Sequence, residues 1–134
     1  MTKKGLLLVG HGSKLPHNKA LIDNTATIMA AKSDQYIVKS GFMSLNEPTV
    51  EESLKAFESE DIDLLVVVPL FLAKGVHILK DIPGILGLGE GEKKGVFRMN
   101  GKEIPLLYAD PIGGDPLLAE LMLKNAENAI RDHL

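Results

Sequence analysis

Two histidines stand at positions where this sequence can do chemistry. His11 follows the apolar run 6–9 and lies between two glycines, and His77 follows the longer apolar run 63–71 by a few residues. Imidazole is the commonest metal ligand in proteins and can also accept a proton near neutral pH. In a chain without cysteine, two imidazoles suit a divalent Co, Ni, Zn, Cu or Fe ion. Because a closed structural site normally has four ligands, the pair predicts loose binding of a metal that is passed on.

The elements that must position these histidines alternate between strands and helices. Four apolar runs, residues 5–10, 36–43, 63–71 and 104–109, predict strands, and two of them are continuously apolar, as in parallel sheets covered on both faces. Apolar residues recur at helical spacing between and after them: Leu21, Thr25, Ile28 and Met29; Val50, Leu54 and Phe57; Leu118, Met122, Ala126 and Ala129. The pattern predicts one α/β domain over residues 1–134, a flavodoxin-like three-layer sandwich with a four-stranded parallel sheet.

Local signals mark where two of these helices begin. Thr49 followed by Glu52 predicts a capping box, and Asp115 before Pro116 predicts the start of the last helix. The stretch 87–102 is rich in glycine and charge, which predicts a mobile excursion with a short hairpin turn at residues 100–101.

Parallel strands end along one edge of a sheet, where ligands usually bind in such folds. If the strands before His11 and His77 are neighbours, both imidazoles face one crevice. Gly10 and Gly12 are expected to let the backbone turn sharply and a ligand approach. His17 and His133 are expected to be solvated.

Other polar residues lie near the same edge. Glu47 is either a solvated acid near a helix start or part of the site. Lys74 is either a surface lysine or a residue of the crevice rim. Asp81 and Pro83 are expected to be structural, with Asp81 capping a turn and Pro83 interrupting the helix after His77. The remaining polar candidates are Ser13, Lys14 and Lys80.

Composition excludes several classes of function. The chain has 134 residues, a net charge of −3, 4% aromatic residues and no cysteine. A nucleic-acid partner, a disulfide framework and thiolate metal sites are therefore not expected. No apolar run reaches the length of a membrane span, and the N-terminus lacks the features of a signal peptide. We expect a cytoplasmic protein.

Three motifs together resemble the sirohydrochlorin chelatases in their short archaeal form. They are VGHGS near the N-terminus, SLNEPT after the second predicted strand and PLFLAKGVHILKDIP after the third, and the late stretch ADPIGGDP is also similar. The resemblance implies a chelatase-like fold and an enzyme that inserts cobalt or nickel into the tetrapyrrole sirohydrochlorin, with release of two protons. Cobalt insertion leads toward cobalamin, and nickel insertion toward the nickel coenzyme of methanogenesis. Longer relatives carry the pattern twice, so the single copy here implies a homodimer.

The resemblance also implies roles for individual residues. His11 and His77 bind the metal, and His11 accepts protons. Glu47 and the segment 72–77 contact the substrate; the segment consists of Leu72, Ala73, Lys74, Gly75, Val76 and His77. No cofactor is implied beyond the substrate metal ion. Since the macrocycle is rich in carboxylates and the chain is net negative, helix N-termini and nearby lysines are expected to bind its arms.

Two other functions share part of this pattern. A histidine phosphatase also places a histidine after its first strand, but its motif has an arginine directly before it, where this chain has Gly10. Arg98 and Arg131 are the only arginines, too few for a phosphate pocket built on arginine forks. A non-enzymatic carrier of metal or tetrapyrrole would use the same two histidines, and fold does not separate it from a chelatase.

Overall fold

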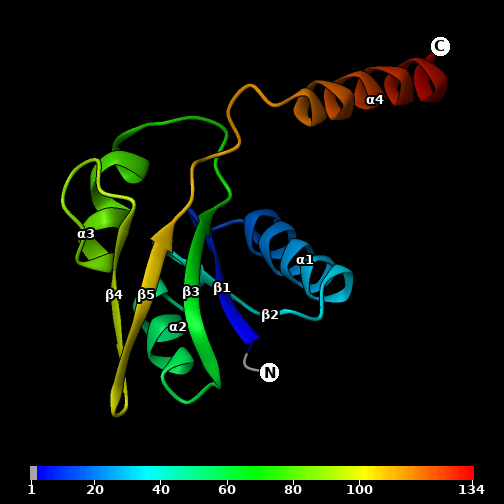
Figure 1. Ribbon diagram of the computed structural model, residues 1–134. Helices are drawn as coiled ribbons and strands as arrows, with labels where there is room; N and C mark the ends of the chain where they lie inside the picture. The colour runs from blue at the N-terminus through cyan, green and yellow to red at the C-terminus, as the bar shows by residue number, and fades with distance from the viewer. Residues whose placement is uncertain (1–2) are drawn as a thin grey trace.

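A five-stranded sheet forms the centre of the structure, a computed structural model that describes residues 3–134 (Figure 1). In spatial order its strands are β2 (Tyr36–Phe42), β1 (Lys3–Gly10), β3 (Ile62–Pro69), β5 (Lys102–Tyr108) and β4 (Lys94–Met99). The first four are parallel, and β4 runs antiparallel to β5. The predicted α/β fold and its four parallel strands are confirmed, but the sheet has a fifth strand that the sequence analysis missed.

The additional strand corrects the expectation for residues 87–102. β4 pairs with β5 along its whole length, and its Phe97 and Met99 are buried in the core. The predicted hairpin turn is confirmed at Gly101, whose φ of +80° suits glycine. The alternation of buried and exposed residues in KGVFRM is that of an edge strand covered on one face. Glycine and charge in the same stretch obscure this alternation in the sequence.

Helices cover the two faces of the sheet unequally. On one face lie α2 (Val50–Phe57), the π-helical turn η1 (His77–Asp81) and α3 (Ile82–Leu86). The core between them and the sheet contains Leu7, Val9, Val50, Phe57, Ile62, Leu65, Val67, Ile78, Ile82, Leu86, Leu88, Phe97, Met99, Ile104, Leu106 and Tyr108. On the other face α1 (Pro16–Lys32) packs on β1 and β2, and its core contains Leu6, Leu8, Ile22, Ala26 and Phe42. The structure therefore has the three predicted layers. The core is larger on the side of α2, η1 and α3 than on the side of α1.

The helix starts follow the local signals. The Thr49 hydroxyl accepts a hydrogen bond from the Glu52 backbone N–H (3.1 Å), and the Glu52 carboxylate accepts one from the Thr49 N–H (2.9 Å), which confirms the capping box. Asp115 caps the last helix by accepting from the Leu117 N–H (2.8 Å). In contrast, α1 begins after Leu15 without a side-chain cap.

Two predicted apolar helix faces are not buried as expected. In α1 the buried residues are Ile22 and Ala26, while Leu21 and Ile28 are 55% and 47% exposed. The last helix, α4 (Pro116–His133), projects away from the sheet, and none of its residues is buried (Figure 1). Consequently no described element covers the half of the α1-side face over β3 and β5. No helix within residues 3–134, α4 included, has the length and apolar character needed to cross a lipid bilayer.

Candidate metal centre

The structure brings His11 and His77 together at the carboxyl edge of the sheet. β1 and β3 are adjacent and parallel, with Val9 opposite Pro69, so the loops that follow them leave from the same point. The Nε2 atoms of the two histidines are 3.0 Å apart, and their ring centroids are separated by 4.6 Å. The two imidazoles lie together, as expected, because the strands before them are neighbours.

Gly12 is required by the path of the chain after His11. Its φ of +93° is strained for any residue with a side chain, and an added Cβ would overlap the Ser44 carbonyl oxygen. At Gly10 an added Cβ would collide with the Ile22 side chain. The predicted sharp turn is confirmed, but the expected access for a ligand is not the reason for these glycines. The space that they leave is filled by the neighbouring loop and by α1.

Two asparagines that the sequence analysis did not identify hold the loop that carries His11. The Gly12 N–H donates to the Asn18 side-chain oxygen (2.9 Å), and the Ser13 N–H donates to that of Asn46 (2.8 Å). Asn46 belongs to the loop after β2, so it joins the loops of two strands. Asn46 is part of the SLNEPT motif, but its partner Ser13 lies 33 residues away, and no local pattern indicates the contact.

His77 is oriented by a carboxylate. Its Nδ1 lies 2.8 Å from Asp81 Oδ2, one helical turn away. The prediction that Asp81 caps a turn is wrong, since its side chain makes no capping hydrogen bond. Pro83 lies in the first turn of α3, so the helical path continues instead of stopping. Because proline offers no N–H to the carbonyl four residues earlier, the preceding turn widens into the π form, in which the Ile82 N–H bonds to the His77 carbonyl.

The turn that carries His77 is anchored to the sheet by Tyr108 of β5. The Tyr108 hydroxyl donates to the Ile78 carbonyl oxygen (2.9 Å) and thereby ties η1 to β5. Burial raises the pKa of Tyr108 to about 12, with a further contribution from the charge of Asp110. Asp110 itself accepts a hydrogen bond from Lys93, which lowers the pKa of its carboxyl group. The phenol therefore remains a neutral donor at physiological pH.

The hydrogen bonds at the Nδ1 atoms of the two rings leave both Nε2 atoms as acceptors. His11 Nδ1 is 3.0 Å from the Gly12 carbonyl oxygen, an acceptor that requires the ring nitrogen to donate. His77 Nδ1 donates to Asp81 in the same way. In the neutral rings both Nε2 atoms then carry lone pairs directed at one another, and a metal ion or a proton between them would relieve their repulsion. Two nitrogens about 2.1 Å from one metal are about 3 Å apart at a right angle and about 3.4 Å apart at a tetrahedral angle. The observed spacing fits neighbouring ligands at a right angle.

The loops at the same edge of the sheet carry exposed apolar side chains, which together are called the apolar rim. The loops after β1, β2 and β3 each carry large apolar side chains that are more than half exposed, namely Leu15, Leu45, Leu72 and Val76. The Phe71 ring lies 6.3 Å from that of His11 and 6.2 Å from that of His77. Exposed apolar groups gathered at the mouth of a site are typical of a binding surface for an apolar ligand.

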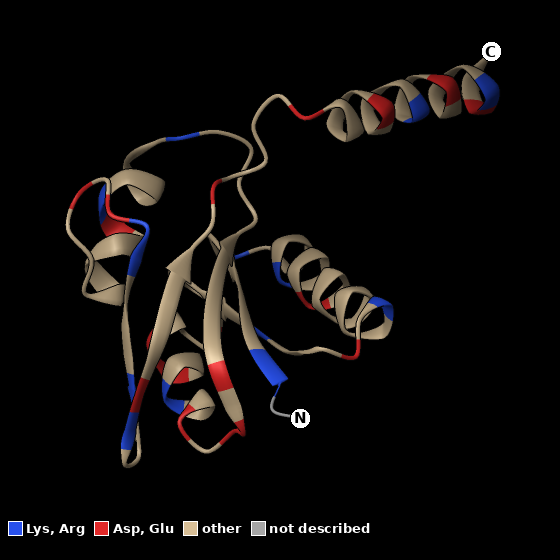
Figure 2. Cartoon of the chain, viewed as in Figure 1, with Lys and Arg blue, Asp and Glu red and all other residues tan. Residues whose placement is uncertain are grey.

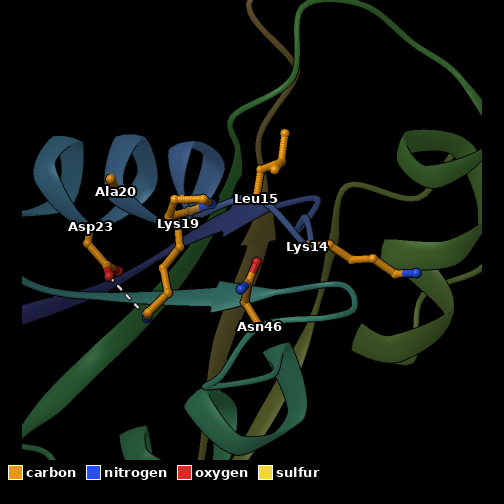
Figure 3. Close-up of a pocket in the computed structure, with 7 residues that line it drawn as sticks. Lys14, Leu15, Lys19, Ala20, Asp23 and Asn46 are labelled. Atoms are coloured by element: carbon orange, nitrogen blue, oxygen red, sulfur yellow. Dashed lines mark ion pairs between the residues drawn. The ribbon is translucent and has the colours of Figure 1, made fainter.

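A groove lies between the start of α1 and the loop after β2 (Figure 3). It has a volume of about 470 Å³ and is lined by Lys14, Leu15, Pro16, Lys19, Ala20, Asp23 and Asn46. Lys19 pairs with Asp23 (3.1 Å) and donates to the Glu47 carbonyl oxygen (2.8 Å), whereas Lys14 extends away from that pair in Figure 3. The Glu47 side chain is exposed on the same loop.

The remaining histidines lie outside this cluster, as expected. His17 is exposed in the first turn of α1, and His133 is exposed at the end of α4. Within residues 3–134 no three His, Asp or Glu side chains gather in a way that could hold a metal ion. A metal bound by both His11 and His77 would have two side-chain ligands from this part of the chain, and water or a bound ligand would complete its coordination.

The sheet edge of this α/β protein presents two opposed imidazoles, side chains of the type that binds divalent metal ions. The chain belongs to the CbiX family, which it matches over residues 5–129. It is 46% identical to the sirohydrochlorin cobaltochelatase of Methanosarcina acetivorans and 44% identical to that of Methanosarcina barkeri, in each case over 97% of this chain and 100% of the relative. Among solved structures it is similar to the sirohydrochlorin chelatase SirB of Bacillus subtilis subspecies spizizenii in complex with cobalt. That similarity has a TM-score of 0.74 at 25% identity and covers 98% of this chain and 51% of the other.

Proposed function

We propose that this chain is a sirohydrochlorin chelatase that inserts a divalent metal, cobalt in the first place, into the macrocycle with release of two protons. The observation that carries the proposal is the pair of Nε2 atoms at 3.0 Å, each with its Nδ1 engaged by an acceptor. Near-identical length and 46% identity to a protein named sirohydrochlorin cobaltochelatase support it.

His11 and His77 hold the incoming metal, and His11 receives the protons that the macrocycle loses. Two nitrogen ligands bind a divalent ion weakly enough to release it to the ring nitrogens. When the metal leaves His11, the Nε2 lone pair becomes free, and a pyrrole N–H bond breaks as its proton moves to that atom. The ring is exposed, so the proton passes to solvent and the second one follows by the same route.

The loops at the sheet edge bind the substrate in this proposal. The apolar rim and segment 72–77 contact the face of the macrocycle, and Glu47 lies beside it. The groove at the start of α1 receives a carboxylate arm, which the uncapped helix N-terminus and Lys14 favour. The start of α2 is a poorer anion site because Thr49 and Glu52 already occupy it. Lys74 and Lys80 add positive charge on the other side.

The choice of metal and the cellular setting are also proposals. Cobalt comes first because the two Methanosarcina relatives are named cobaltochelatases. Nickel, which the same nitrogen ligands accept, is the second candidate and would connect the chain to methanogenesis. A cytoplasmic location stays a prediction.

Two chains pair in the active form in our proposal. A single chain offers two imidazoles and an open edge, which is small for a macrocycle with many charged arms. The SirB chain is about twice as long as this one, with 98% of this chain matching 51% of it. A homodimer of this chain would have about the length of one SirB chain.

Metal insertion into sirohydrochlorin tests the function directly. Purified protein is mixed with excess sirohydrochlorin and cobalt, nickel or iron at equal concentration, and the visible spectrum is followed against the uncatalysed rate. A chelatase converts many equivalents, with cobalt or nickel fastest. A spectral change that stops at one equivalent per chain would identify a carrier instead.

A further inference from the structure

The two imidazoles of the proposed metal centre differ in the group that accepts a hydrogen bond from Nδ1. His77 Nδ1 donates to the Asp81 carboxylate at 2.8 Å, and His11 Nδ1 donates to the Gly12 backbone carbonyl at 3.0 Å. A hydrogen bond to an ionised acceptor is roughly twice as strong as one between neutral groups. The two rings are thus alike at Nε2, where they oppose one another, and unlike at Nδ1.

The surroundings of the two rings show the same contrast in charge. The loop between β1 and α1, which carries His11, contains no acidic residue, whereas η1 contains both Lys80 and Asp81 (Figure 2). The Phe71 ring lies at nearly the same distance from both imidazoles, 6.3 Å from His11 and 6.2 Å from His77, so it does not distinguish them. The charged acceptor at His77 is therefore the feature that separates the two rings.

This difference affects how strongly each ring binds a metal. An imidazole that binds a divalent ion through Nε2 gains positive charge, which its Nδ1–H shares with the acceptor. A carboxylate acceptor stabilises this charge and raises the basicity of the ligand. The His77 and Asp81 side chains are 42% and 44% exposed, so solvent weakens the effect while the contact remains formed. His77 is consequently the stronger ligand of the pair.

The backbone is fixed on both sides of the pair. After His11, the N–H groups of Gly12 and Ser13 donate to asparagine side chains. The turn that carries His77 is tied to β5 by the hydroxyl of Tyr108. Release of a metal therefore depends on the strength of each metal–nitrogen bond and not on movement of one loop away from the other.

We propose that a metal leaves the two histidines in a fixed order, His11 first and His77 last, and that Asp81 is the positioning residue that sets this order. The inference rests on the chelatase function proposed above and describes how its site works. The bond between the metal and His11 Nε2 breaks as a bond to a macrocycle nitrogen forms. The freed lone pair accepts the proton of a pyrrole N–H bond while His77 still holds the metal. In the opposite order, the metal would occupy the proton acceptor until transfer ended.

Atoms and charge balance in this order. The first proton passes from His11 Nε2 to solvent, and the second pyrrole proton follows it to the same atom. The bond between His77 Nε2 and the metal breaks last, when the macrocycle supplies its remaining nitrogen ligands. The ion stays divalent throughout, so the sequence of steps needs no oxidant or reductant.

Cobalt affinity in the absence of tetrapyrrole is the first test. Nuclear magnetic resonance of isotope-labelled imidazoles resolves the 4 histidines separately and follows weak binding. His11→Ala, which keeps His77 and Asp81, should bind cobalt about tenfold more tightly than His77→Ala. Asp81→Ala should weaken cobalt binding by about tenfold or more in the wild type and in His11→Ala, and should have no effect in His77→Ala. Asp81→Asn, which keeps an acceptor without the charge, should fall between Asp81→Ala and the wild type.

Insertion kinetics provide the second test, because the order of release separates kcat from the KM for cobalt. His11→Ala should lower kcat. Asp81→Ala should raise the KM for cobalt by about tenfold and leave kcat near the wild-type value, since a weaker last ligand does not delay release. The control is Asp34→Ala, which removes an exposed carboxylate from the loop before β2 and should change neither quantity.

Three results would overturn the order of release. They are equal cobalt affinity of His11→Ala and His77→Ala, an effect of Asp81→Ala that is the same in both backgrounds, and a large fall in kcat for Asp81→Ala at saturating cobalt. None of them bears on whether the wild type inserts metal. A wild type without turnover would instead overturn the proposed function, while the affinities, measured without tetrapyrrole, would still test the difference between the two ligands.

Discussion

The two histidines of the proposed metal centre are held in different ways. His11 is oriented by backbone: Gly12 takes a left-handed conformation, and its carbonyl accepts from the His11 ring. His77 is oriented by a side chain, the Asp81 carboxylate, on a turn that Tyr108 anchors through a buried hydrogen bond. The orientation of the His11 ring therefore depends on the backbone conformation of a loop. The orientation of the His77 ring depends on a charged side chain.

This difference predicts different consequences of change on the two sides. A substitution that adds bulk to the His11 loop should disturb the fold, because the space there is already filled by Ser44 and Ile22. A substitution that removes the charge beside His77 should leave the fold intact and alter metal binding, because Asp81 is exposed.

Replacing either histidine should give the largest loss. In the proposed mechanism His11→Ala removes a metal ligand and the proton acceptor, so the rate of metal insertion should fall by about 10²- to 10⁴-fold. His77→Ala removes only a metal ligand and should be less damaging. Both variants should fold and bind sirohydrochlorin normally. The control is His17→Ala, an exposed histidine on α1 that should retain full activity. Near wild-type rates for both active-site variants would place the metal elsewhere.

Removing the carboxylate beside His77 should lower metal affinity. Asp81→Ala leaves His77 Nδ1 without its acceptor, so cobalt affinity should fall by about 10- to 100-fold. Asp81→Asn keeps an oxygen acceptor and should be less affected. The measurement is a cobalt titration, combined with the insertion rate at saturating cobalt, which should largely recover. Unchanged affinity in Asp81→Ala would mean that the hydrogen bond does not orient the ligand.

A matched pair of glycines tests the backbone side of the contrast. Gly12→Ala should reduce the free energy of unfolding by about 1 to 3 kcal/mol, because its φ is left-handed and its Cβ overlaps Ser44. Gly75→Ala, in the loop before His77, has open space around it and should change stability by less than about 0.5 kcal/mol. Urea denaturation measures both. Equal stability of the two variants would contradict the proposed difference between the loops.

The smallest effect is expected at the anchor of η1. Tyr108→Phe should reduce stability near neutral pH by about 1 kcal/mol, because the Ile78 carbonyl loses its donor. In the wild type the pKa of Tyr108 is about 12 when folded, above its usual value of about 10 when unfolded. The neutral phenol therefore contributes stability that is fully present below pH 10 and is lost as the pH rises toward 12. Denaturation across this range should show the loss in the wild type and in Tyr36→Phe, but not in Tyr108→Phe.

The sequence predicted those parts of the molecule that depend on local patterns. Apolar runs that end before His11 and His77 indicate two strand ends, and Thr49 with Glu52 indicates a helix start. Contacts between distant residues were not predictable in the same way. Asn46 and Tyr108 reach partners 33 and 30 residues away, and nothing in their neighbourhood indicates this.

Two of the segments that differ from the expectation, β4 and α4, have physical explanations. The strand β4 is an edge strand, covered on one face, so its alternating pattern is weak beside its glycine and charged residues. The helix α4 was predicted correctly as a helix, with Asp115 as its cap, but none of its residues is buried by the rest of the described chain, residues 3–134. A periodic pattern reveals that a face is apolar and does not reveal which surface covers it.

The most direct test of the account is the position of cobalt in crystals of the protein, located by anomalous diffraction. We predict one cobalt ion about 2.1 Å from the Nε2 atoms of both His11 and His77, with the Asp81 carboxylate still accepting a hydrogen bond from His77 Nδ1. Cobalt bound to one histidine alone, or at a site that includes neither, would contradict the claim that the opposed imidazoles form the metal centre.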